Sequence, residues 1–139
     1  WLRRRRAVET GEDSFLPPLE QLEALTAELS ADAATIPSQI FCDRLASGFR
    51  RFLERRTGDP ALEMTSFELR VLARNRRWPE PVQRAMHRVL EVVDGVRFGR
   101  RSVPHPELVQ AAATALDGGR ALERHLAPAA TEDPVEAAS

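Results

Sequence analysis

Apolar residues recur at intervals of three and four along much of this chain, most clearly between Phe41 and Gly58. This period places side chains on one face of an α-helix, so the segment predicts a long amphipathic helix at the centre of the core. Gly58 is expected to end it, as glycine commonly does at a helix C-terminus. The predicted apolar stripe is Phe41, Leu45, Phe49, Phe52 and Leu53. The predicted solvated face is Arg44, Arg50, Arg51, Arg55 and Arg56.

Four further helices are predicted on the same basis, and prolines or a polar cap mark their starts. Pro17-Pro18 begins the first, because proline is tolerated in a first helical turn. Thr65 and Glu68 have the spacing of a capping box, and prolines at 79, 81, 104 and 106 begin the last two helices. The expected apolar stripes are Leu19, Leu22, Leu25 and Leu29; Phe67, Val71 and Leu72; Val82, Met86, Val89, Leu90 and Val93; and Leu108, Val109, Ala112, Leu116, Leu122 and Leu126.

Glycines mark two further features of the predicted helices. Phe98 lies between Gly95 and Gly99, where we expect the fourth helix to end and the phenyl ring to pack back into the core. Gly118-Gly119 falls inside the last helix, where each glycine costs roughly 1 kcal/mol relative to alanine. The pair therefore predicts either a break or a close approach between backbones.

These patterns define the fold class and the domain organisation. No alternation typical of β-strands extends over a useful length, so we predict an all-α protein, a compact bundle of about five helices. Residues 1–14 are expected to be a basic juxtamembrane flank and an acidic linker, and residues 15–127 the helical domain. Residues 128–139, rich in alanine, proline and acids, predict a disordered C-terminal tail.

The charges are unevenly distributed along the 139 residues, although the net charge is only -1. Every cation is arginine; residues 7–43 contain acids but no arginine, whereas arginines outnumber acids from 44 to 101. An acidic first third packed near a basic middle is expected to match it electrostatically. Cys42 is the single cysteine, so no internal disulfide is expected and a small buried side chain is the simplest interpretation.

No motif for catalysis or cofactor binding is present. The three histidines are far apart in the sequence and lack the spacing of a helical zinc site. There is no lysine-containing phosphate loop and no G-x-S-x-G segment. We therefore expect a protein that is not an enzyme and has no cofactor or metal.

Arginines are the strongest candidates for contact with a partner. The residues proposed for this role are Arg50, Arg51, Arg55, Arg74, Arg76 and Arg77. Clustered arginines also suit nucleic acid, so a soluble basic helical regulator that binds nucleic acid is the alternative. The slightly negative net charge disfavours that alternative. A helical module that self-assembles is a third possibility.

The first six residues suggest a membrane-proximal position. Trp1 and Leu2 precede Arg3, Arg4, Arg5 and Arg6. An indole favours the headgroup region and arginines oppose translocation, so this order is typical of the cytoplasmic side of a membrane helix. A solvated basic tail and a nucleic-acid-binding arm are the alternatives.

Three segments occur in an order that resembles a known group. They are Phe49–Gly58, Ala61–Leu69 and Asp94–Gly99. This order resembles the cytoplasmic C-terminal domain of bacterial inner-membrane proteins encoded beside MoxR-type AAA+ ATPases and von Willebrand A-domain proteins, the BatD-like group. That group shares an aromatic-Leu-x-x-Arg segment, a helix start with two threonines, and Asp-x-x-Arg/Lys-Phe. Thr65-Ser66 stands where two threonines are usual, and the similarity covers residues 40–100.

The resemblance implies a non-enzymatic scaffold or adaptor domain on the cytoplasmic side of a bacterial inner membrane, after an upstream span. The implied partner is a MoxR-type ATPase or a von Willebrand A-domain protein. No catalytic residues carry over from the group.

Overall fold

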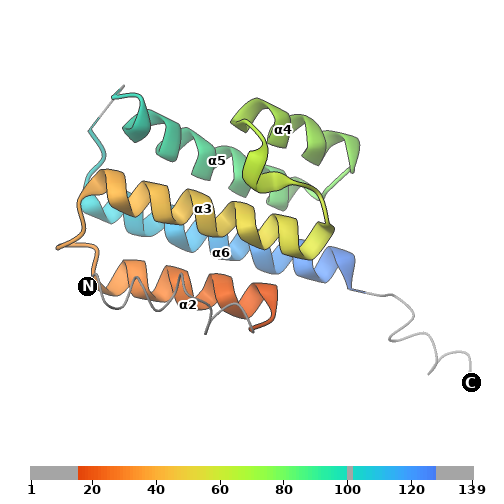
Figure 1. Ribbon diagram of the computed structural model, residues 1–139, viewed down its shortest axis with the longest axis horizontal. Coiled ribbons are helices and arrows are strands. Elements are labelled where there is room, and N and C mark those ends of the chain that lie inside the picture. Colours follow the sequence, from red (N-terminus) through yellow and green to blue (C-terminus); the bar gives the residue numbers. More distant parts are fainter. Residues whose placement is uncertain (1–15, 100–101, 128–139) are drawn as a thin grey trace, which may run out of the picture.

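The computed structural model describes residues 16–99 and 102–127, and in these residues the protein is all-α (Figure 1). The helices are α2 (Pro18–Ala31), α3 (Ser38–Thr57), α4 (Ser66–Asn75), α5 (Glu80–Arg97) and α6 (His105–Leu126), with a short 3-10 turn η2 (Ala61–Glu63). The predicted bundle of about five helices is confirmed. The predicted flank and linker at 1–14 and the predicted tail at 128–139 lie outside the described residues.

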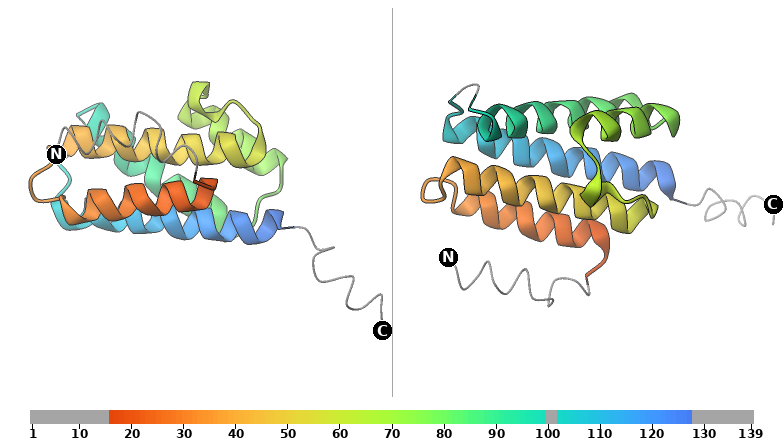
Figure 2. Two further views of the ribbon diagram at one scale, coloured as in Figure 1. Left: turned by 60° about the horizontal axis from the view of Figure 1, so that its bottom comes forward. Right: turned by 45° about the horizontal axis from the view of Figure 1, so that its top comes forward.

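Four of the helices form an up-down-up-down bundle. Consecutive long helices α2, α3, α5 and α6 run in alternating directions (Figures 1 and 2). Helix α3 packs against α2, α5 and α6, whereas α4 packs mainly on α5 and lies outside the bundle. The short helix α4 and the turn η2 thus cover one edge of α3 and α5.

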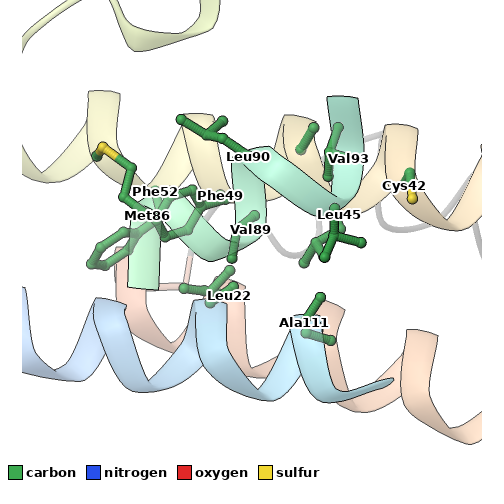
Figure 3. Packing of buried hydrophobic residues seen from close by; sticks show 14 of the residues in the cluster. Leu22, Cys42, Leu45, Phe49, Phe52, Met86, Val89, Leu90, Val93 and Ala111 are labelled. Atoms are coloured by element: carbon green, nitrogen blue, oxygen red, sulfur yellow. The ribbon is translucent and has the colours of Figure 1, made fainter. Parts of the chain in front are cut away.

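Helix α3 supplies the largest buried side chains. Phe41, Leu45, Phe49, Phe52 and Leu53 are all 2% exposed or less, which confirms the predicted stripe. Figure 3 shows Phe49 and Phe52 beside Met86 and Val89 of α5, with Leu22 of α2 close by. Because α3 has neighbours on three sides, its apolar side chains are enclosed along its length.

Both predicted helix caps are present. Gly58 ends α3 at a φ of 84°, in the left-handed region, and its N–H donates to the Glu54 carbonyl at 2.8 Å. At the start of α4, the Glu68 N–H donates to Thr65 Oγ1 at 3.1 Å and the Thr65 N–H donates to Glu68 Oε1 at 2.8 Å. These caps satisfy backbone groups that have no partner inside a helix.

The glycine pair in α6 allows close approach and does not break the helix. A Cβ on Gly118 would lie 2.6 Å from the Ala85 Cβ of α5, and one on Gly119 would lie 2.8 Å from Leu22 Cδ2 of α2. Helix α6 continues through both positions. Adjacent glycines therefore let α6 pack closely against two helices at once.

Helix α5 ends at Arg97, between Gly95 and Gly99 as expected, but two aspects of the sequence-based interpretation were wrong. Phe98 does not pack into the core but is 61% exposed. Helix α4 buries Leu69 and Ala73, whereas Phe67 on its predicted apolar side is 70% exposed. Phe67 is exposed because α4 packs mainly on one other helix, and such a helix buries only a narrow stripe.

Arg44 was also predicted to be solvated, but it is buried because α2 covers it. Its Nη1 atom donates to Glu28 Oε2 at 2.8 Å, and the two side chains are 5% and 10% exposed. More exposed pairs also cross between helices: Arg56 with Glu123, and Arg120 with Glu23. The Arg44–Glu28 pair fits the expected match between the acidic first third and the basic middle.

We predict that Phe49→Ala lowers the free energy of unfolding by about 3–5 kcal/mol, because it leaves a cavity in an enclosed core. Chemical denaturation measures this change. The control Phe67→Ala should stay within about 0.5 kcal/mol of wild type, because that ring is mostly exposed. A loss below about 1 kcal/mol for Phe49→Ala would contradict the central position of this ring.

We predict that Gly118→Ala destabilises the protein by about 1–3 kcal/mol despite the better helix propensity of alanine, because helices α5 and α6 must move apart. Ala85→Gly removes the opposing methyl group and provides the control background. In that background the added cost of Gly118→Ala should fall below about 0.5 kcal/mol. Equal costs in both backgrounds, measured by denaturation, would exclude contact with Ala85 as the cause.

Candidate interaction site

The large exposed apolar side chains of the described residues gather around one cleft. They are Leu62, Phe67 and Phe98, which are 41%, 70% and 61% exposed. The cleft has a volume of about 550 Å³ and lies between α3, the η2–α4 connection and the end of α5. We name it the Phe67–Phe98 cleft. Apolar residues that gather at one place on a surface are typical of an interaction site.

Local structure fixes the two phenylalanines on different elements. Phe67 is the second residue of α4, directly after the capping box at Thr65. Phe98 follows the last residue of α5, and its N–H donates to the Asp94 carbonyl at 3.0 Å. In Figure 1, α4 and the end of α5 lie on the same side of α3. The cleft therefore depends on the position of α4 relative to the bundle.

Arg50 lines this cleft and holds the connection between η2 and α4 against α3. It is only 9% exposed, and its Nη1 atom donates to the carbonyl oxygens of Met64 and, at 3.4 Å, of Ala61. Burial lowers the pKa of Arg50; nearby Arg97 adds to this effect and Asp94 opposes it. The sequence-based assignment of Arg50 to an exposed partner-binding face was therefore wrong, because the connection after α3 folds back over this side chain.

A second, smaller cleft lies on the other side of Phe67, between α4 and α5. Its volume is about 240 Å³, and its lining residues are Phe67, Arg70, Ala73, Arg74, Gln83, Met86 and His87. Arg70 and Arg74 are one helical turn apart. We name it the α4–α5 cleft. Phe67 is thus shared by both clefts.

The other arginines proposed from the sequence do not form one surface. Arg55 donates to Gln21 Oε1 at 2.8 Å, and Arg76 pairs with Asp59 at 2.5 Å. Arg51 is half-buried on α3, and Arg77 follows α4 with a φ of 55°. Only Arg50 and Arg74 of the six line either cleft, and they line different ones. The membrane-proximal residues Trp1, Arg3, Arg4, Arg5 and Arg6 lie outside the described residues.

The described residues show neither a cluster of metal ligands nor an activated thiol. Within 16–99 and 102–127, no three His, Cys, Asp or Glu side chains are grouped so that they could hold a metal ion. Cys42 is buried, as expected, and desolvation by burial raises the pKa of its thiol to about 11, with Asp43 adding to the shift. At neutral pH this thiol is protonated and so a poor nucleophile.

None of the helices in the described ranges is long and apolar enough to span a membrane.

Comparison with known proteins found no relative of this chain: no family model, no curated protein and no solved structure matches it. The class that can be stated is therefore structural, a four-helix bundle with one short helix packed outside it.

Phe67 and Phe98 were expected on buried faces because apolar residues are usually found in the core. A signal was available for α4: Leu69 and Ala73 are four positions apart and form an alternative stripe on which Phe67 does not fall. No comparable signal distinguishes Phe98, whose exposure depends on where α5 ends relative to α3.

We predict that Arg50→Met lowers the free energy of unfolding by about 1–3 kcal/mol, because it removes the donor to the Met64 carbonyl. Amide hydrogen exchange should accelerate in η2 and the first turn of α4, since this contact holds the connection against α3. Arg51→Met is the matched control and should stay within about 0.5 kcal/mol of wild type. Similar stability and exchange in the two variants would contradict an anchoring role for Arg50.

Proposed function

We propose that this chain is a non-enzymatic scaffold or adaptor domain that binds another protein, and that it acts with a MoxR-type AAA+ ATPase at the cytoplasmic side of a bacterial inner membrane. The observation that supports a binding role is the Phe67–Phe98 cleft, where Leu62, Phe67 and Phe98 are exposed together. The ATPase and the membrane are proposed from the resemblance of residues 40–100 to the BatD-like group and from the order of residues in Trp1–Arg6.

The cleft suits a protein surface better than a small molecule. The cleft is open to solvent. Two of the side chains that line it, Phe67 and Phe98, are large rings that remain mostly exposed to water. Aromatic side chains at the centre of an interface contribute much of the binding energy once a partner excludes water from them. Phe67 is the best placed for this role, because it borders both clefts and is the most exposed.

The test uses a purified MoxR-type ATPase from the same genome and the full chain. Binding is measured by biolayer interferometry with ATP and with ADP. We expect Phe67→Ser to weaken binding by about tenfold or more, as loss of an aromatic anchor does. The thermal unfolding midpoint should remain close to that of wild type, because the ring is 70% exposed.

Ala113→Ser, at an exposed position on α6 outside both clefts, is the control and should bind like wild type. Failure of the ATPase to bind in either nucleotide state would refute the proposed partner. Tight binding of duplex DNA that weakens steeply with salt would instead support the nucleic-acid alternative.

A further inference from the structure

The two clefts beside Phe67 differ in charge. The Phe67–Phe98 cleft is lined by Arg50 and Arg97 together with the acids Glu63 and Asp94, so its charges balance. The α4–α5 cleft is lined by two arginines and one histidine, and no carboxylate of the described residues lines it. A partner segment that enters this cleft beside Phe67 therefore meets two arginines and no carboxylate in its lining.

Arg70 and Arg74 also differ from most arginines of the bundle. Neither Arg70 nor Arg74 is in an ion pair within the described part of the chain. On the long helices, the arginines that pair with acids are Arg44, Arg56, Arg84, Arg88, Arg97 and Arg120. The Nε atom of Arg70 is buried and has no hydrogen-bond partner there. A buried donor without an acceptor is costly, so the Arg70 side chain is not positioned by internal hydrogen bonds of this atom.

Phe67, Arg70 and Arg74 form one stripe along α4. Their spacing of three and four residues places them on the same face of the helix, over a length of roughly 10 Å. This stripe is short enough to be covered by a single extended or helical segment. Its order is an aromatic ring at one end followed by two cations.

We infer that the segment which docks here is an acidic protein segment with one large apolar side chain. The apolar side chain packs against Phe67, and two carboxylates placed toward one end of the segment pair with Arg70 and Arg74. Charge-assisted hydrogen bonds from the guanidinium groups to carboxylates fix the direction of the segment. The inference rests on the proposed binding function and names the chemistry of the partner's docking segment.

Acids near the stripe disfavour a polyanion such as nucleic acid or an anionic membrane. Glu63 and Asp94 line the cleft on the other side of Phe67, and Glu68 follows it in α4. A surface of repeated phosphates that covered Phe67 would meet these carboxylates. A protein segment can place its acids on one side of its apolar residue only.

The test is selection from a random peptide library displayed on phage, with the full chain as bait. We expect enriched peptides to contain a large apolar residue with two or more Asp or Glu within about two helical turns on one side. For synthetic copies, fluorescence anisotropy should show a loss of affinity of roughly tenfold or more in Arg70→Glu/Arg74→Glu. Replacing the peptide's acids by glutamine should weaken binding similarly, and Phe67→Ser should weaken it independently.

Arg51→Glu/Arg77→Glu changes the net charge equally and is the matched control; both residues lie outside the two clefts. Loss of binding in this pair instead would overturn the inference and favour the contacts first expected from the sequence. No enrichment, or enrichment without acidic bias, would also overturn it. So would binding of DNA or anionic vesicles that needs Arg70 and Arg74 but not Phe67.

The proposed partner and this inference can fail separately. If the MoxR-type ATPase binds with equal affinity to wild type and to Arg70→Glu/Arg74→Glu, the proposed function stands and the inference fails. If acidic peptides bind as expected but the ATPase does not, the docking chemistry stands and the proposed partner is wrong.

Discussion

Burial of helix α3 on three sides is the constraint on which the rest of the fold depends. Its phenylalanines are enclosed only if α2, α5 and α6 all remain in place. The neighbouring elements also cover polar positions of α3 that would be exposed to water if the helix were isolated. Arg44 and Arg50 are buried for this reason, and each has internal acceptors, the Glu28 carboxylate for one and backbone carbonyls for the other. Buried guanidinium groups are tolerated because they are hydrogen-bonded.

Close packing between the helices follows from small residues at defined positions. Gly118 faces Ala85, and Gly119 faces Leu22, so α6 approaches α5 and α2 from one stretch of two residues. Gly48 of α3 is in similarly close contact with Leu25 of α2. Glycine lowers helix propensity, but the tertiary contacts that it permits outweigh that cost in a bundle.

Much of the fold could be predicted from the sequence because its signals are local and consistent. The stripe from Phe41 to Leu53 and the capping box at Thr65 each determine a structure within a few turns of chain. The exposure of Phe98 and the burial of Arg50 could not be predicted in this way. Both depend on which element lies over a given face, and that is decided by contacts between distant segments. The candidate site consists largely of such residues, so the sequence indicated arginines and missed the aromatic rings.

Helix α4 is the one described helix outside the four-helix bundle, and its stability has to come from few interactions. A ten-residue helix is marginal in water by itself. Here a capping box fixes its start, Leu69 and Ala73 pack inward, and Arg50 of α3 holds the preceding connection. All of these contacts are on the inner side or at the N-terminus, so none of them requires Phe67 to be apolar. An exposed ring at such a position adds nothing to the core that the structure describes and favours association with other surfaces. Its placement beside two arginines without ion pairs in the described chain is what supports the binding role that we propose for this face of α4.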